Sequence, residues 1–163
     1  MTRIGLFAGS FDPPSLGHLD IIKKASHLFD RLILGVSHKL EKQGKAFFSS
    51  QEKIHLLQLA THSLANVDIA EFEGLAVRFA QEKKATHLIR GLRALSNHDA
   101  EFQMALANRC LSNIETVFLL GDERYAHISS TLIREVAYAG GPLKEFVSPE
   151  IEELIRKKLD RLE

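Results

Sequence analysis

The sequence of 163 residues contains a single cysteine, Cys110. No disulfide bond can therefore form within the chain, and a reducing cytoplasm is the simplest compartment for it. Cys110 lies in the stretch 104–111, where apolar residues recur at helical spacing. This setting favours a buried, structural thiol over a catalytic nucleophile.

The sequence also lacks an excess of charge of either sign, because 21 Lys and Arg balance 21 Asp and Glu. A neutral chain creates no global field that would attract nucleic acid or an acidic membrane, although a local anion site remains possible. No apolar run approaches the ~18 residues of a membrane span. The N-terminus does not show the basic, apolar and small-residue order of a signal peptide. We therefore expect a cytoplasmic protein that binds neither nucleic acid nor membranes.

What the sequence does contain is typical of a folded protein, with 45% hydrophobic and 26% charged residues. A length of 163 residues predicts one domain, here 1–163, since domains commonly have ~100–200 residues. A domain of this size buries enough surface to fold without a disulfide or a structural metal.

Short apolar runs alternate with segments of helical periodicity along the whole chain. Strands are predicted at 3–7, 31–36, 67–72, 86–89 and 116–120. Helices are predicted at 19–29, after the capping box 49–52, and at 75–83, 99–111, 130–139 and from 148 onward. This alternation predicts an α/β fold, with a doubly wound parallel sheet of five strands and helices on both faces. Ligands of such sheets bind at the carboxyl ends of the strands.

The exit of the first strand carries Gly9-Ser10-Phe11-Asp12-Pro13-Pro14-Ser15-Leu16-Gly17-His18. Gly9 is expected to let the chain turn sharply, and Ser10 places a hydroxyl at the strand tip. His18 falls in the first turn of the next helix, where free backbone N–H groups and the helix dipole favour an anion. An imidazole that donates a hydrogen bond there can stabilise negative charge on a phosphate.

The exits of the fourth and fifth strands are also suited to phosphate. Arg90 and Arg93 flank Gly91 and Leu92, and forked guanidinium groups bind phosphate oxygens in bidentate fashion. Glu101 is either the ion-pair partner of these arginines or an acceptor for a nucleoside. After the fifth strand, Ile128-Ser129-Ser130-Thr131 offers hydroxyls and free amides at a helix start, which equally suits simple N-capping.

The first-strand stretch resembles the nucleotidyltransferase signature, a Gly-Ser/Thr-Phe-Asp-Pro loop followed by Thr/His-x-Gly-His. Here Ser15-Leu16-Gly17-His18 occupies the second part, with Ser where Thr or His is usual. Arg90-Gly91-Leu92-Arg93, Glu101 and Asn108-Arg109 resemble the phosphopantetheine adenylyltransferase branch of that superfamily, and the likeness runs from Ile4 to about Phe146. The resemblance implies a Rossmann-like fold and adenylyl transfer from ATP to 4′-phosphopantetheine, giving dephospho-coenzyme A and pyrophosphate.

By this resemblance, most of the candidate site binds ATP. Its ATP-binding residues would be Ser10, Phe11, His18, Gly91, Leu92, Arg93, Glu101, Tyr125, Ala126, His127, Ile128, Ser129, Ser130 and Thr131. The acceptor would be bound by Ser10, Lys42, Leu75, Ala76, Arg90 and Asn108, although the family often has a larger residue at the position of Ala76. His18, Lys42 and Arg93 would be catalytic.

The loop after the second strand departs from the family pattern. It lacks the Pro of the usual Lys-Lys-Pro and is about two residues longer. Lys42 matches the substrate-binding lysine when counted from the second strand, and Lys45 matches it when counted back from Phe48. Lys42 is the preferred candidate, and Lys39 is interpreted as a solvated charge.

The resemblance further implies in-line attack by an already ionised phosphate, without a covalent intermediate. Mg²⁺ would arrive with ATP, since we find no dedicated cage of metal ligands, and the family typically forms hexamers. We expect the site to be strongly positive. Two alternatives remain: a related enzyme with another acceptor, such as nicotinate mononucleotide, FMN or a phosphorylated alcohol, and a catalytically silent nucleotide-binding module.

Overall fold

The computed structural model describes residues 1–95 and 98–162. Its sheet has five parallel strands in the order β3-β2-β1-β4-β5. The strands are β1 (Ile4–Gly9), β2 (Arg31–Ser37), β3 (Val67–Phe72), β4 (His87–Leu92) and β5 (Glu115–Leu120). The chain therefore leaves β1 toward one side of the sheet and, after β3, crosses to the other side, as a doubly wound sheet requires.

Helices connect the strands and extend beyond β5. They are α1 (Leu16–Leu28), α2 (Lys39–Lys42), α3 (Ser50–Thr61), α4 (Ala76–Glu82), α5 (Asp99–Ser112), α6 (Ser130–Tyr138) and α7 (Pro149–Asp160), with a 3-10 turn, η1, at Glu123–Tyr125. The expected capping box is present, because Ser49 and Glu52 exchange hydrogen bonds at the start of α3. None of the helices in the described ranges is long and apolar enough for a membrane span.

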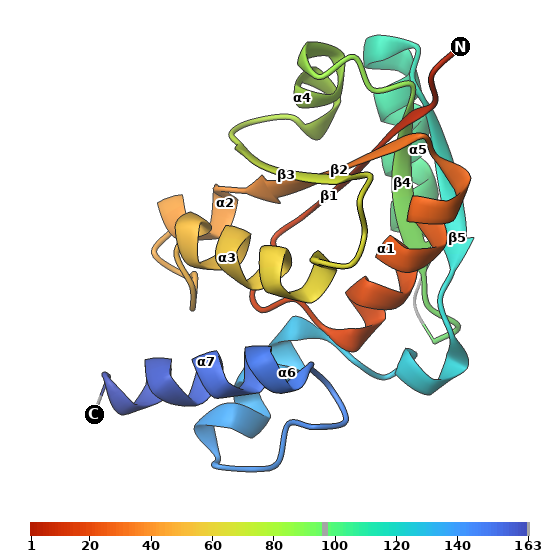
Figure 1. The fold of residues 1–163 in the computed structure, drawn as a ribbon. Coiled ribbons are helices and arrows are strands. Elements are labelled where there is room, and N and C mark those ends of the chain that lie inside the picture. Colours follow the sequence, from red (N-terminus) through yellow and green to blue (C-terminus); the bar gives the residue numbers. More distant parts are fainter. Residues whose placement is uncertain (96–97, 163) are drawn as a thin grey trace.

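The two faces of the sheet are covered by different helices, as predicted (Figure 1). Apolar residues of α1 and α3, including Ile22 and Leu57, pack with Phe7 and Leu34 on one face. Residues of α4, including Phe79, pack with Leu6 and neighbouring strand residues on the other. Adjacent residues such as Leu6 and Phe7 serve opposite faces because side chains alternate along a strand.

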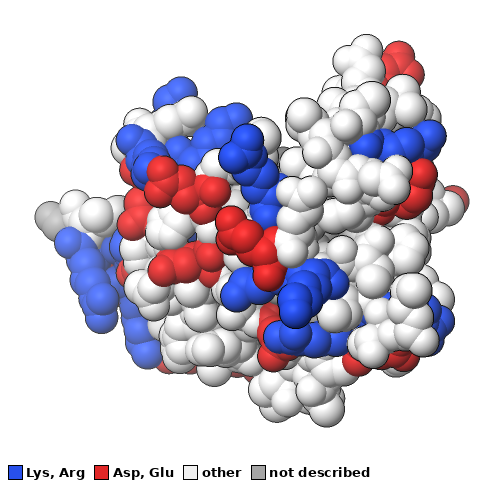
Figure 2. Space-filling view, turned by 90° about the horizontal axis from the view of Figure 1, so that it is seen from above, with Lys and Arg blue, Asp and Glu red and all other residues white. Residues whose placement is uncertain are grey.

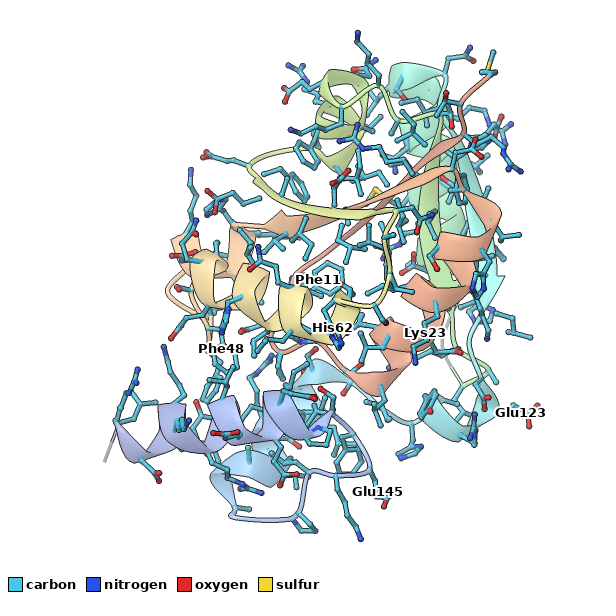
Figure 3. All side chains as sticks on the ribbon, in the orientation of Figure 1. Phe11, Lys23, Phe48, His62, Glu123 and Glu145 are labelled. Carbon is cyan, nitrogen blue, oxygen red and sulfur yellow. The ribbon has the colours of Figure 1, made fainter. Side chains whose placement is uncertain are left out.

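A third apolar cluster lies away from the sheet and joins α3 to α6 and α7. It includes Phe48, Ile133 and Ile151, all nearly inaccessible to solvent. Figure 3 shows Phe48 between α3 and α7, and Phe11 between the sheet and α3. This cluster holds α6 in place, so that its N-terminus reaches the loop after β1.

Three expectations need correction. Cys110 is exposed rather than buried, because α5 covers only the edge of the sheet and none of its described residues is buried. Gly9 does not provide the turn after β1, since the left-handed conformation falls on Phe11, with φ of 46°. Arg90, Gly91 and Leu92 lie within β4 rather than after it, because they pair with Phe118, Leu119 and Leu120 of β5. The polar loop after β2 also contains a short helix, α2.

Candidate active site

A pocket of about 420 Å³ opens at the carboxyl ends of β1, β4 and β5. This is the side of β1 on which the strand order reverses, the place where doubly wound sheets bind ligands. Of the residues predicted from the sequence, it is lined by Ser10, Phe11, His18, Arg90, Gly91, Leu92, Arg93, Glu101, Tyr125, Ile128, Ser129 and Ser130. A second pocket of about 500 Å³ shares Gly91, Leu92, Arg93 and Glu101 with it and adds Ala126 and His127.

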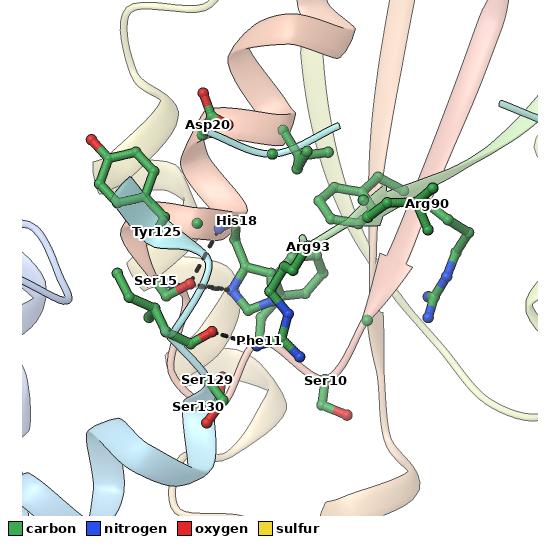
Figure 4. A pocket seen from close by; sticks show the side chains of 18 of the residues that line it. Ser10, Phe11, Ser15, His18, Asp20, Arg90, Arg93, Tyr125, Ser129 and Ser130 are labelled. Atoms are coloured by element: carbon green, nitrogen blue, oxygen red, sulfur yellow. Dashed lines mark hydrogen bonds between the residues drawn. The ribbon is translucent and has the colours of Figure 1, made fainter. Parts of the chain in front are cut away.

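His18 is fixed by reciprocal hydrogen bonds with Ser15 at the start of α1. The hydroxyl of Ser15 accepts from the backbone N–H of His18 at 3.2 Å. The backbone N–H of Ser15 donates to Nδ1 of His18 at 3.0 Å, so that the two residues form a capping box with His in the place of the usual Glu. Figure 4 shows the hydroxyl of Ser15 between the backbone nitrogen and Nδ1 of His18, and the imidazole beside Arg93.

The bond from Ser15 also sets the tautomer of His18. Because Nδ1 accepts a backbone N–H, the proton of the neutral ring must be on Nε2. The pKa of His18 is lowered from 6.5 to about 4, first because burial disfavours the imidazolium and then because Arg93 and Arg90 are positively charged. The ring packs against Phe11, with centroids 5.0 Å apart. His18 is therefore a neutral donor, through Nε2–H, at physiological pH.

Arg90 is held by Glu101, its ion-pair partner in this structure. Nε and Nη2 of Arg90 donate to the two carboxylate oxygens at 2.7 and 2.9 Å. These bonds, made by Arg90, lower the pKa of Glu101. Arg90 points away from His18, whereas Arg93 lies next to it (Figure 4).

Arg93 is exposed but attached to the segment that follows β5. Its Nη1 donates to the backbone carbonyl of Ile128 at 2.6 Å. The neighbouring Gly91 has a packing reason to lack a side chain, because a Cβ there would lie 2.8 Å from Cγ1 of Ile21. Glycine thus lets β4 approach α1 closely enough to bring Arg93 beside His18.

The start of α6 supplies the opposite wall of the pocket. The hydroxyl of Ser129 accepts from the N–H of Leu132 at 3.1 Å, and is thus used as an N-cap. The hydroxyl of Ser130 donates to the carbonyl of Pro13 at 2.9 Å and ties α6 to the loop after β1. The amides of Ser130 and Thr131, at the first two helical positions, have no acceptor within their helix and can bind an anion.

Five predicted residues lie in neither pocket: Lys42, Leu75, Ala76, Asn108 and Thr131. Lys42, in α2, is ion-paired with Glu73. Lys45 is exposed in the segment between α2 and α3 and is not a lining residue either. The structure therefore does not decide between the two lysines, although both follow β2 at the carboxyl edge of the sheet.

The expectation that the site is strongly positive is wrong for this pocket. Its arginines, Arg90 and Arg93, are accompanied by the carboxylates of Asp20, Glu101 and Asp122. Asp20 accepts from the N–H of Asp122 and from Nζ of Lys24, both at 2.8 Å. Acidic and basic side chains are likewise interspersed over the face shown in Figure 2.

Asp20 and Asp122 were missed by sequence reasoning. Asp20 follows His18 by two residues, and Asp122 follows β5, so both occupy positions that the rule of strand exits could have identified. Nothing in the residue types alone distinguishes them from solvated acids.

Comparison with known proteins gives the family. A model of the cytidylyltransferase-like family matches residues 6–136. The chain is 43% identical to the phosphopantetheine adenylyltransferase of Thermodesulfovibrio yellowstonii, over 99% of this chain and 100% of that protein. It is 41% identical to the phosphopantetheine adenylyltransferase of Caldanaerobacter subterraneus, over 98% and 99% of the two chains.

A solved structure from Vibrio parahaemolyticus, provisionally described as a nicotinate-nucleotide adenylyltransferase, has a similar fold. Its TM-score is 0.66 and its sequence identity is 20%, over 95% of this chain and 99% of that chain. At this identity the likeness concerns the fold alone, and it confirms the predicted Rossmann-like architecture.

The environment of His18 predicts how the protein responds to acid. Between pH 6.5 and about 4, the unfolded chain takes up a proton on His18 that the folded protein does not. His18 therefore lowers the free energy of unfolding progressively as pH falls through this window. The imidazole of the folded protein stays neutral over the same range and keeps its Nε2–H donor. An NMR titration, with the resonance assigned through His18→Gln, should give a pKa near 4. A His18 that titrates near 6.5 in the folded protein would contradict this environment.

Proposed function

Because the chain belongs to the phosphopantetheine adenylyltransferase family, within the cytidylyltransferase-like proteins, we propose that it transfers the adenylyl group of ATP to 4′-phosphopantetheine. The products are dephospho-coenzyme A and pyrophosphate. The observation that carries this proposal is the 43% identity over 99% of the chain. The gathering of the two signature segments around one pocket supports it.

In this reaction the acceptor phosphate attacks the α-phosphorus of ATP in line and pyrophosphate leaves. The attacking oxygen is already ionised, so the protein needs no general base and forms no covalent intermediate. Its contribution is positioning and stabilisation of charge on the transferring group. His18 donates Nε2–H to a phosphate oxygen, and Arg93 and the amides at the start of α6 neutralise the remaining charge.

The acceptor side is formed by groups around the same edge of the sheet. Arg90, oriented by its two bonds to Glu101, binds a phosphate oxygen through its remaining donors. When the acceptor binds, Lys42 gives up its ion pair with Glu73 and contacts the phosphate group of the acceptor. Leu75, Ala76 and Asn108 contact the pantetheine arm, and the exposed side chain of Leu75 is available for this contact.

Mg²⁺ accompanies ATP in this proposal. Among the described residues, no group of three or more His, Cys, Asp and Glu is placed to hold a metal ion. Asp20 is engaged by Lys24 and Asp122, and Asp122 by Arg124. This donor set fits an ion whose ligands are phosphate oxygens and water, and which, when bound, neutralises phosphate charge.

We also propose that the protein works in the cytoplasm, without nucleic acid or membrane partners, as an oligomer of identical chains, with a hexamer as the family-based expectation. The large apolar side chains that α5 and β5 leave exposed support self-assembly. They are Phe102, Met104, Leu106, Leu111 and Leu120. Such a surface is typical of contacts between protein chains. Cys110 belongs to the same helix.

The reaction is tested by mixing the protein with MgATP and each candidate acceptor and measuring pyrophosphate release. We expect release with 4′-phosphopantetheine, and replacement of His18 by Ala should lower kcat by on the order of 10²-fold or more, because one preorganised donor to the transition state is lost. His27→Ala, an exposed residue at the other end of α1, is the control and should turn over like wild type. Release only with a different acceptor, no release at all, or normal turnover by folded His18→Ala would each contradict the proposal.

The two arginines should separate kinetically. Arg90→Ala should raise the KM for the phosphorylated acceptor roughly tenfold or more, as expected for a lost charged hydrogen bond. Arg93→Ala should act mainly on ATP. Arg109→Ala removes an arginine paired with Glu115 outside the pocket and should change neither KM. An effect of Arg90→Ala confined to ATP affinity would overturn this division.

The lysine assignment can be decided with three parallel variants. Lys42→Ala should raise the acceptor KM roughly tenfold, since a charged contact to phosphate is lost. Lys39→Ala and Lys45→Ala should leave it near the wild-type value. If Lys45→Ala carries the effect and Lys42→Ala does not, the register counted back from Phe48 is the correct one.

A further inference from the structure

The short helix α2 carries Lys42 and depends on polar contacts for its place in the molecule. All four of its residues are exposed or half-buried, so apolar packing does little to hold it. Its N-cap is His38, whose backbone N–H donates to the carbonyl of Phe72 in β3 at 3.1 Å. The carbonyl of His38 accepts from the N–H of Lys42 at 3.0 Å. The position of Lys42 therefore depends on what holds His38.

The side chain of His38 joins α2 to two other elements. Its Nε2 lies 3.2 Å from Oε2 of Glu71 in β3. Its Nδ1 lies 3.0 Å from the hydroxyl of Ser50, the first residue of α3. Glu41 makes a second contact between α2 and α3, because its Oε2 accepts the backbone N–H of Ser50 at 2.9 Å and also the hydroxyl of Ser50. The start of α2 thus meets β3 and α3 at one imidazole ring.

The hydrogen bonds around this ring require two donors from it. The hydroxyl of Ser50 has a single proton, which is used in the bond to Glu41. The hydroxyl oxygen can then only accept from Nδ1–H of His38, while Nε2–H of His38 faces the carboxylate of Glu71. Both contacts form together only when the ring carries both protons. A neutral ring has one N–H and must give up one of the two contacts.

Acidic groups face the ring from both α2 and β3. They are the carboxylates of Glu41 and Glu71. The bonds from Ser50 lower the pKa of Glu41 most, and His38 and Lys53, the latter from α3, lower it further through their charges. Glu41 is thus an ionised acceptor, as the bonds from Ser50 require.

The end of β3 holds α2 at two points. Glu71 contacts His38 at the start of the helix, and Glu73, directly after β3, is ion-paired with Lys42 at its end. Lys42 lowers the pKa of Glu73, and the charge of His38 adds to this effect. When Lys42 gives up Glu73 for a phosphate, the contact between His38 and Glu71 is what keeps α2 at β3.

We propose that His38 is a positioning residue whose doubly protonated ring attaches the start of α2 to β3 and α3 and thereby sets where Lys42 meets the acceptor phosphate. His38 acts through Lys42 and does not touch substrate. The effect on acceptor binding rests on the proposed function, whereas the attachment of α2 does not. The attachment weakens as pH rises through about 5 to 8, the range in which histidine changes charge.

Two substitutions break this junction from opposite sides. His38→Phe keeps a ring but removes both N–H donors, and Glu71→Gln keeps an oxygen but removes the charge. Asp68→Asn is the matched control, because Asp68 is an exposed carboxylate of the same strand, β3, and pairs with Arg31 of β2. This pair lies near the amino ends of the two strands, whereas α2 follows the carboxyl end of β2.

Amide exchange of the folded proteins, measured by NMR, tests the attachment of α2 without any turnover. The N–H of Ser50 is the reporter, because its acceptor is the carboxylate of Glu41. In His38→Phe we expect this amide to exchange about fivefold faster or more than in wild type, and in Asp68→Asn to stay within about twofold. Unchanged exchange of Ser50 in His38→Phe would overturn the proposal. If His38→Phe does not fold, Glu71→Gln decides by the same measurement.

Kinetics test the functional part through the acceptor KM of each variant relative to wild type. Near pH 6, His38→Phe should raise this KM about fivefold or more, with kcat and the KM for ATP within about twofold of wild type. Above about pH 8 the ratio should fall toward one, because a deprotonated wild-type ring keeps only one of its two contacts. A ratio that does not change with pH, or a loss of kcat that follows only the folded fraction, would overturn the proposal.

The action of His38 through Lys42 has a test of its own. In protein that already carries Lys42→Ala, the substitution His38→Phe should change the acceptor KM by less than about twofold, because no ammonium remains to be positioned. An effect of His38→Phe that is undiminished by Lys42→Ala would overturn the proposal. Absence of pyrophosphate release by wild type would refute the proposed function, and the exchange of the Ser50 amide would still decide whether His38 attaches α2.

Discussion

The reciprocal hydrogen bonds between Ser15 and His18 are the interaction on which the rest of the site depends. They begin α1, and they also consume Nδ1 of His18, which leaves the proton on Nε2. Because α1 packs through Ile21 and Ile22 against the sheet, the ring is placed with respect to β1 and β4 as soon as the helix forms. Helix start, tautomer and location of the donor are therefore three consequences of one local motif.

The sheet topology explains why sequence segments more than a hundred residues apart meet at this donor. With β1 in the centre, its exit faces the exits of β4 and β5 on one side and those of β2 and β3 on the other. The pocket lies on the first side, and the lysines of the α2 region lie on the second. Beneath the loops, Asp12 links both sides through buried hydrogen bonds to Phe47 and Phe48, and Arg134 adds α6 to the same network.

Much of this arrangement is predictable from the sequence, because it depends on local pattern. The apolar run at 31–36 differs clearly from helical spacing, and the signature from Gly9 to His18 has few interpretations. Helical spacing around Cys110 indicates an apolar face, but it does not tell whether another layer covers that face, and no layer formed by residues 1–95 and 98–162 buries Cys110. Lys42 pairs at the surface with Glu73, 31 residues further along the chain, and the buried carboxylate of Asp12 binds amides 35 and 36 residues away. Such long-range contacts leave no periodic signal.

We propose that the neutral Nε2–H of His18 is the hydrogen-bond donor to the phosphate group that is transferred. A crystal structure with a non-hydrolysable ATP analogue and Mg²⁺ tests it most directly. We expect Nε2 to lie within ~2.7–3.1 Å of an α-phosphate oxygen, with Nδ1 still bound to the N–H of Ser15. An α-phosphate that lies beyond hydrogen-bond reach of Nε2, or a ring turned so that Nδ1 faces the ligand, would contradict it.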